Sequence, residues 1–388
     1  MSVNNLNTEQ CYQLIADLHA MATGQQTATP TDLSSFISVA QGTLAAGTEP
    51  VLNALSQVVS DTIYAVRPYS RKFAGLEVTA EKWGGILRKV SYADRNPLPD
   101  NTTLLVDGQS IDQYKVRKAN VLETHYVGSD TWSGCYTIYT DQLITAFSSP
   151  SEFGSFMTNL TLHFSNEREQ WLENMSRATV ANLIGAKADM AQDVIHLLTE
   201  YNAATGLSLT ATTVRQPANF PAFIRWMYAR INSISDKMTE RSELYQQVIT
   251  GKPIMRHTPK ADQRVYISAD FLAEINAEVK SITYNSSFLE MADVEPVGFW
   301  QAIDSPYALD VTPVYVDSAA AVKVGSAQTL TNIIGVIFDR DAAAYNIKVN
   351  TIEMSPYNAD GRYWNMFAHM DIQYMNDVTE KAVVFALD

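Results

Sequence analysis

The stretch SPSEFGSFMTNLTLHFSNEREQWLENMSRATVANLIG, residues 149–185, decides the fold because it predicts one helix of unusual length. Ser149 is a preferred N-cap, Pro150 suits the first helical position, and Glu152 stands where a capping box places its acid. Apolar residues then recur at steps of three and four without an interrupting proline, and Gly185 predicts the helix end. About 35 residues at about 1.5 Å each give a rod of about 50 Å. Because helices average about 11–12 residues, we expect this rod to brace something wide and flat.

The composition of the 388-residue chain predicts a protein with a large core and no membrane segment. It is 46% hydrophobic and 18% charged, and no apolar run is long enough to cross a bilayer. The start of the chain lacks the basic-then-apolar layout of a signal peptide, which predicts a cytoplasmic protein. The two cysteines, Cys11 and Cys135, support neither a disulfide framework nor a zinc site. Both are expected to be small buried hydrophobic residues.

Charge is unevenly distributed along the chain, whose net charge is −14. This value argues against a nucleic-acid-binding protein, which needs a basic face. Residues 67–120 hold ten Lys or Arg and six Asp or Glu, a net of +4, whereas residues 261–388 hold seven and 18, a net of −11. One interpretation is ordinary surface scatter. The other is that the basic segment of one copy lies on the acidic body of the next, since opposite fields steer such contacts.

The regions around the long helix differ in pattern. Residues 1–65 predict helices, the first of them capped by Asn7 with Gln10. Residues 66–147 fall into short apolar runs broken by proline and glycine, which predicts extended strands with little core of their own. Residues 190–260 look mostly helical. Strands are predicted at 264–268, 314–316, 333–338, 345–349, 364–374 and 383–386, so the expected class is α+β.

Sequence motifs for catalysis or metal binding are missing. The six histidines never fall at metal-ligand spacing, and neither a nucleophile elbow nor a phosphate loop occurs. We therefore predict no catalytic, cofactor-binding or metal-binding residue. Asp339-Arg340-Asp341 is interpreted as a strand-end turn with a local ion pair. The aromatic run at 361–370 is expected to serve core and interface, although a carbohydrate-binding platform uses similar residues.

The order of these parts resembles the major capsid proteins of tailed phages, which have the HK-97 fold. The long helix is similar to the spine helix of that fold, and the strand-rich segment before it is similar to the extended loop. The resemblance implies an α+β capsid fold with these expected parts: a helical N-terminal arm at 1–65, the extended loop or strand arm at 66–147, the spine helix and the start of the peripheral domain at 148–189, the axial domain at 190–330, and C-terminal strands returning to the peripheral domain at 331–388.

Local sequence narrows the resemblance to the phi-29-like head proteins. Residues 147–156 are similar to the start of the spine helix in that group, and residues 265–275 to a strand and helix of its axial domain. Residues 358–365 are similar to its tyrosine–tryptophan strand near the end of the fold. Residues 334–342 resemble a segment of capsid proteins from gut phages.

The resemblance implies a non-enzymatic major capsid protein without cofactors. Such a protein assembles as hexamers and pentamers into an icosahedral or prolate shell that encloses double-stranded DNA without reading its sequence. It is expected in the virion, after assembly in the host bacterial cytoplasm. The implied partners are further copies of the chain, a portal, decoration proteins and, since only about 65 residues precede the loop, a separate scaffolding protein. Three alternatives stay open: an encapsulin-like compartment shell, a tail or portal protein, and a carbohydrate-active enzyme.

The basic residues of the strand arm are the expected subunit-interface residues. Opposite charge would hold them on the acidic body of a neighbouring copy. These residues are Arg88, Lys89, Arg95, Arg117 and Lys118.

Overall fold

The computed structural model of the chain describes residues 7–45, 47, 50–51, 54–55, 71–78, 86–92, 107–108, 114, 120–127, 129–282 and 294–388. The described helices are α1 (Thr8–Thr23), α2 (Leu33–Ala45), α4 (Thr140–Ala146), α5 (Pro150–Asp189), α6 (Leu197–Thr205), α7 (Phe220–Thr239) and α8 (Ala269–Ile282). The described strands are β1 (Ile86–Tyr92), β2 (Val121–Val127), β3 (Asp130–Tyr139), β4 (Val194–His196), β5 (Gln263–Ser268), β6 (Val294–Val297), β7 (Leu309–Val311), β8 (Val314–Val316), β9 (Val322–Val324), β10 (Gln328–Leu330), β11 (Ile333–Asp339), β12 (Ala343–Met354), β13 (Tyr363–Asn376) and β14 (Ala382–Ala386).

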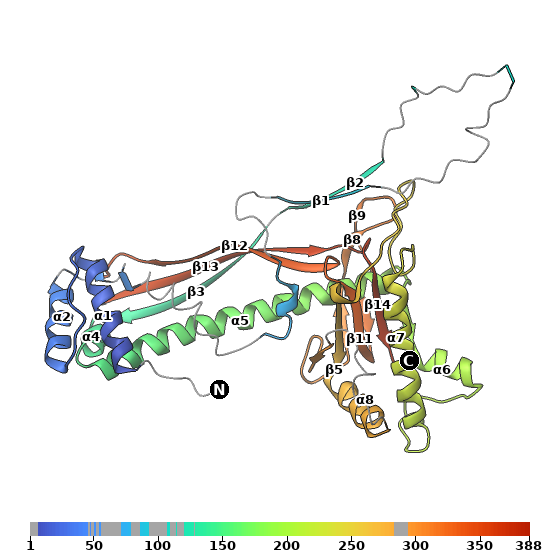
Figure 1. Cartoon of the computed structure of the whole chain (residues 1–388), viewed down its shortest axis with the longest axis horizontal. Helices are drawn as coiled ribbons and strands as arrows, with labels where there is room; N and C mark the ends of the chain where they lie inside the picture. Colours follow the sequence, from blue (N-terminus) through green and yellow to red (C-terminus); the bar gives the residue numbers. More distant parts are fainter. Residues whose placement is uncertain are drawn as a thin grey trace.

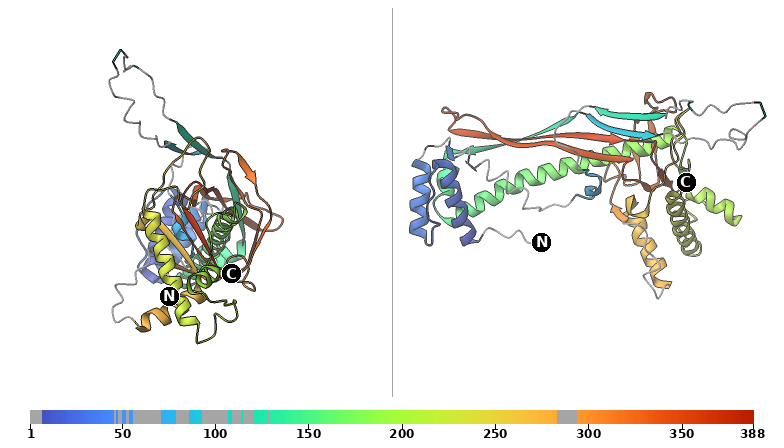
Figure 2. Two further views of the ribbon diagram at one scale, coloured as in Figure 1. Left: turned by 90° about the vertical axis from the view of Figure 1, so that its right-hand side faces the viewer. Right: turned by 45° about the horizontal axis from the view of Figure 1, so that its top comes forward.

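The molecule is elongated, and α5 runs beside a three-stranded sheet along much of its length (Figure 1). This sheet is antiparallel and has the strand order β12-β13-β3. At one end lie α1, α2 and α4, and at the other a five-stranded sheet lies with α6, α7 and α8 (Figures 1 and 2). This mixture of helices and sheets confirms the predicted α+β class.

Helix α5 begins as predicted and ends later than predicted. The Ser149 hydroxyl accepts a hydrogen bond from the Glu152 amide at 3.2 Å, and the helix continues for 40 residues to Asp189. Gly185 therefore does not end the helix. A Cβ atom at this position would lie 2.4 Å from the side chain of Val311 in β7. Glycine therefore lets α5 pass close to β7.

The three-stranded sheet buries alternate residues of β13 against α5. Trp364, Met366 and Ala368 belong to the same buried cluster as Phe153 and Leu160 of the helix. Such alternation is the period of a strand that has one buried face. The burial of Trp364 and Met366 confirms the core role predicted for the aromatic run.

The five-stranded sheet has the order β4-β14-β11-β5-β6 and is covered on both faces. Val384 of β14 packs in the cluster that includes α5, and its neighbours Val383 and Phe385 pack in the cluster that includes α6, α7 and α8. β11 and β14 are buried along their full length, as expected for central strands between two layers.

A charged stripe on α5 holds the segment 71–78, which crosses the helix. Glu173 accepts a hydrogen bond from the Lys72 amide at 2.8 Å and pairs with Arg177 at 2.7 Å. One turn earlier, Glu169 pairs with Arg71 at 3.1 Å. All four paired side chains are almost completely buried, so the crossing segment is fixed to α5 by charges that have little access to water.

Asp189, the last residue of α5, binds the β8–β9 hairpin and the loop that follows it. Its carboxylate accepts hydrogen bonds from the Tyr315 hydroxyl at 2.6 Å, the Ser326 amide at 2.9 Å and the Lys323 ammonium at 3.2 Å. The bond from Tyr315, then that from Ser326, and the charge of Lys323 hold the pKa of Asp189 well below its usual value. The ionised carboxylate therefore fixes the end of the helix to this hairpin.

Replacing Asp189 by asparagine is expected to destabilise the protein in a pH-dependent way. A carboxyl group with a lowered folded-state pKa stabilises the fold above its unfolded pKa, and that stability is lost as the pH falls through the folded-state value. The difference in the free energy of unfolding between wild type and variant should thus have its largest value at pH 7 and decrease below about pH 4. Urea unfolding across this range measures it. An unchanged difference at low pH would contradict this role, and Asp304→Asn on an exposed turn is the control.

The N-terminal helices pack on the end of α5. Asn7 and Gln10 form the predicted capping box at the start of α1, with reciprocal hydrogen bonds of 2.7 and 2.9 Å. Phe36 of α2 lies 6.2 Å from Phe153 of α5, ring centre to ring centre. The helix predicted shortly after residue 48 lies mostly outside the described residues.

The segment 66–147 is predicted as the strand arm, but its later part, β3 and α4, packs beside α5 in the body of the subunit. β3 pairs with β13 over ten positions, and α4 buries Leu143 in the cluster at the end of α5. The arm prediction is wrong for these residues because β3 has a long partner strand and a helix to cover it. Cys135 is also exposed, contrary to prediction, since its neighbours Gly134 and Tyr136 take the face of β3 that turns toward α5.

Candidate functional site: the base of the arm hairpin

Strands β1 and β2 form an antiparallel hairpin, here called the arm hairpin, that lies along the body near the end of the three-stranded sheet (Figure 1). Its two faces differ. Ser91 and Leu122 are buried on the inner face, whereas Tyr92 and Val127 on the outer face are 68% and 72% exposed. Alternate residues of a strand point to opposite faces, so this pattern separates body-binding from outward-facing side chains. A hairpin of two strands is marginal alone and needs such a support.

Lys89 is the main polar anchor on the inner face of the arm hairpin. Its ammonium lies 2.6 Å from a carboxylate oxygen of Asp377 and 2.6 Å from one of Glu380. Both acids belong to the turn between β13 and β14, and their side chains are only 4% and 7% exposed. Buried charges are retained when they are paired, so these contacts fix the hairpin to the body.

Arg256 completes this set, which we call the arm-base network: Lys89, Arg256, Asp377 and Glu380. The guanidinium of Arg256 pairs with Glu380 at 3.0 Å and donates a hydrogen bond to the Ser91 hydroxyl at 3.1 Å. Arg256 lies in the loop between α7 and β5, so three separate parts of the chain meet here. Two cations balance two anions, which keeps the network neutral overall.

The pKa values in the network reflect burial working against pairing. Burial disfavours the charged form of Lys89, but attraction by Asp377 and Glu380 outweighs it and raises the pKa of this lysine. Burial likewise opposes ionisation of Asp377, yet the charge and hydrogen bond of Lys89 lower its pKa. For Glu380, burial outweighs its cationic neighbours and raises the pKa. Lys89 and Asp377 therefore form the charged pair at the centre of the network.

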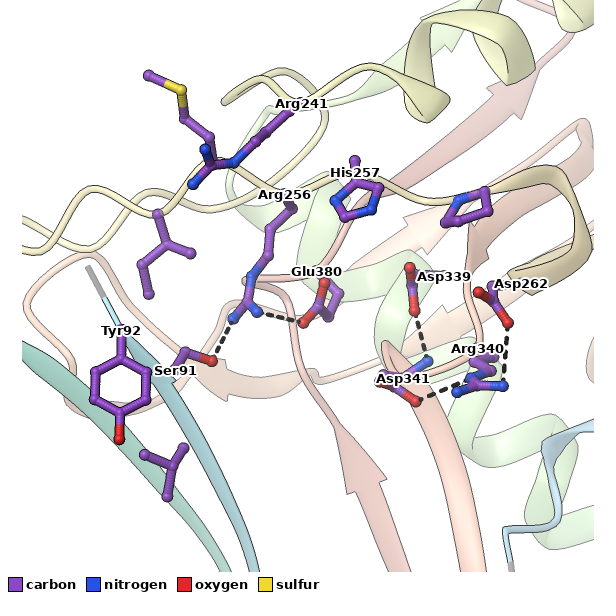
Figure 3. A pocket seen from close by; sticks show the side chains of 14 residues that line it. Ser91, Tyr92, Arg241, Arg256, His257, Asp262, Asp339, Arg340, Asp341 and Glu380 are labelled. Atoms are coloured by element: carbon purple, nitrogen blue, oxygen red, sulfur yellow. Dashed lines mark hydrogen bonds and ion pairs between the residues drawn. The ribbon is translucent and has the colours of Figure 1, made fainter. Parts of the chain in front are cut away.

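An open cavity of about 550 Å³ lies next to the network (Figure 3). Arg340 projects into it and pairs with Asp262 at 3.1 Å and Asp341 at 3.6 Å. These contacts confirm the predicted strand-end turn with a local ion pair. Asp339 instead accepts a hydrogen bond from the Thr258 hydroxyl at 2.7 Å. The carboxylates of the lining are thus bound by cations or hydroxyls of the same chain, an arrangement typical of a structural site.

Two of the five predicted interface residues can be placed. Arg88 lies on the outer face of the arm hairpin, 60% exposed, and pairs with Glu123 across the strands. Lys89 faces inward and binds its own subunit rather than standing free for a neighbour. Arg95, Arg117 and Lys118 lie outside the described residues.

Sequence reasoning missed the partners of Lys89. Arg256, Asp377 and Glu380 have no local pattern that marks them, and they lie far from Lys89 in the chain. The one available signal is the pair of acidic residues in the turn at 376–380, directly before the last strand. Across the described ranges, no group of three His, Cys, Asp or Glu side chains is arranged as a metal site. No helix in the described part of the chain has the length and hydropathy that crossing a membrane requires.

Comparison with known proteins gives a family for this architecture. A model of the Phi29-like phage major capsid protein family matches residues 22–386. The chain belongs to this family of major capsid proteins. The match extends over almost the whole chain, including the long helix, the arm hairpin, the three-stranded sheet and the five-stranded sheet.

Solved structures show the fold of this capsid protein. The capsid structure of Staphylococcus phage Andhra matches with a TM-score of 0.54 and 12% identity, covering 82% of this chain and 84% of that chain. A structure of the head fiber and inner core protein gp22 of native bacteriophage P68 matches with a TM-score of 0.53 and 9% identity, covering 82% and 85%. No curated protein matches the sequence.

These findings confirm the predicted HK-97-type fold and the predicted role. The capsid protein is a structural subunit of a tailed-phage head, which self-assembles into the shell of the virion. Family membership supports this role over an encapsulin-like compartment and over a tail or portal protein.

Proposed function

We propose that the arm hairpin joins neighbouring copies in the shell: its inner face stays bound to its own subunit and its outer face contacts the next copy. The observation that carries this proposal is the difference between the two faces. Lys89 and Ser91 are engaged by the body, whereas Tyr92 and Val127 are exposed beside the Arg88–Glu123 pair. Exposed apolar and aromatic side chains next to charges are typical of interfaces.

Shell assembly then depends on many modest contacts made at once. Hexamers and pentamers would combine several such interfaces for each copy, and their sum in a closed shell is effectively irreversible. In this proposal α5 forms the peripheral part with β3, β12 and β13, and the five-stranded sheet forms the axial part around capsomer centres with α6, α7 and α8. The expected return of all of residues 331–388 to the peripheral domain is thus limited to β12 and β13, because β11 and β14 are central strands of the five-stranded sheet. The net charge of −14 supports a wall that encloses DNA without binding it tightly or reading its sequence.

The partners and place of assembly follow from the same proposal. Assembly takes place in the host cytoplasm with a separate scaffolding protein and a portal, and decoration proteins bind the finished head. The chain has no catalytic role in this scheme, because every step is an association between folded surfaces.

The direct experiment is assembly of the purified capsid protein, alone at high concentration and together with its scaffolding protein. Negative-stain microscopy should show closed particles. Monomers under every condition would contradict the proposed function. A ring or tube would instead favour a tail or portal role.

Reversing the charges of Arg88, Arg117 and Lys118 to glutamate should block assembly and leave the subunit folded. Arg88 is mostly exposed and its pair with Glu123 is on the surface, so its loss should change stability by only about 0–1 kcal/mol. Circular dichroism measures folding, and particle yield measures assembly. Lys260→Glu, on an exposed ion pair elsewhere, is the matched control. An unfolded triple variant would place these residues in a core, and unchanged yield would remove them from the interface.

A further inference from the structure

The loop between α7 and the 3-10 turn at Lys260–Asp262, here called the brace loop (residues 240–258), is closed on itself. The Ser242 amide donates a hydrogen bond to the Arg256 carbonyl at 3.0 Å, which joins the two ends. Inside, the buried Gln246 side chain donates to the Ile254 carbonyl and accepts from the Arg256 amide at 3.2 Å. A surface loop whose ends meet and whose interior is filled by its own side chains is compact and can act as one unit.

The outer part of the brace loop contacts the arm hairpin and a second hairpin. The Lys252 ammonium donates a hydrogen bond to the carbonyl of Val121, the first residue of β2, at 2.8 Å. The Thr250 amide donates to the Ser318 carbonyl between β8 and β9 at 2.8 Å. Arg256 reaches Ser91 of β1. Both strands of the arm hairpin are therefore held by this loop.

The inner part of the brace loop is fixed to the centre of the molecule. The Tyr245 carbonyl accepts hydrogen bonds from the Lys187 ammonium at 3.1 Å and from the Ala382 amide at 2.8 Å. Lys187 is completely buried near the end of α5 and also pairs with Asp193 at 2.8 Å. Tyr245 has a φ of 68°, a left-handed conformation that persists when surrounding contacts determine it.

From these contacts we propose that the brace loop sets the angle of the arm hairpin and thereby the curvature of the shell. This inference rests on the proposed function, because the angle matters only if the arm joins neighbouring copies. The brace loop is a closed unit. One side of it is fixed to α5 and β14, and the other side is fixed to both strands of the arm hairpin. The loop therefore transmits the position of the body to the arm hairpin. A looser brace lets the arm take several angles, so shells form with several diameters.

Exchanging Lys252 for methionine tests the proposal, since methionine keeps the aliphatic stem and removes the ammonium that binds the Val121 carbonyl. In unassembled subunits, amide hydrogen exchange at 121–127 should rise about tenfold, the effect of losing one hydrogen bond to a charged group. Assembled variant shells should have a broader distribution of diameters than wild type. Lys260→Met is the control, and Gln246→Ala, which opens the loop from within, is the second variant.

Each outcome of this experiment has a defined meaning. Wild-type exchange at 121–127 in both variants, or variant shells of one wild-type diameter, would overturn the role of the brace loop. Wild-type subunits that never form shells would instead contradict the proposed function, and the exchange measurement on single subunits would still report on the brace.

Discussion

Replacing Lys89 by glutamate is expected to abolish shell assembly and to lower the free energy of unfolding by about 3–5 kcal/mol. The substitution places a third carboxylate beside Asp377 and Glu380, which are almost completely buried, and leaves Arg256 as their one cation in the arm-base network. The inner face of the arm hairpin then loses its main anchor. Urea unfolding measures the stability, and negative-stain microscopy of assembly reactions measures the shells.

Two control variants separate the network from general charge effects. Arg88→Glu lies one residue away on the exposed face of the same strand and should leave the free energy of unfolding within about 1 kcal/mol of wild type. Lys89→Arg keeps the charge and should retain most of the stability. Equal stability of Lys89→Glu and wild type would show that the hairpin is not held by this network.

Replacing Glu173 by alanine should be the most destabilising single change in the charged stripe of α5. It should lower the free energy of unfolding by about 3–5 kcal/mol. Glu173 pairs with Arg177 and accepts the Lys72 amide, and its removal leaves the mostly buried guanidinium of Arg177 without its carboxylate. The crossing segment 71–78 then keeps the Arg71–Glu169 pair but loses the attachment of its Lys72 amide to the helix. The midpoint of urea unfolding measures the loss.

Glu167 supplies the matched control on the same helix. Its side chain is 45% exposed and its contact with His163 is long, at 3.5 Å, so Glu167→Ala should change stability by less than about 1 kcal/mol. If Glu173→Ala behaved like Glu167→Ala, the buried stripe would not be what fixes the crossing segment.

Local patterns predicted the parts of the fold that depend on nearby residues. Ser149, Pro150 and Glu152 mark the start of α5, and Asn7 with Gln10 mark the start of α1, because capping acts within one turn of a helix. The late strands were also predicted, since their apolar residues alternate or run together. The capsid fold itself came from resemblance in the order of these elements.

Contacts between distant residues could not be predicted. Gly185 predicts a helix end from the sequence, and only the nearby Val311 shows that it is a packing position. Local pattern places β3 in the arm, because the partner strand that holds it in the body, β13, lies more than 200 residues later in the chain. The charge of Lys89 alone predicts a contact with a neighbouring copy, whereas Asp377 and Glu380 of its own chain bind it.

A cryo-electron microscopy map of the assembled shell tests the central claim most directly. We predict that the outer face of each arm hairpin, at Arg88, Tyr92 and Val127, contacts a neighbouring subunit while Lys89 remains bound to Asp377 of its own chain. An outer face that meets only solvent or its own subunit would contradict the claim that this hairpin joins copies of the capsid protein.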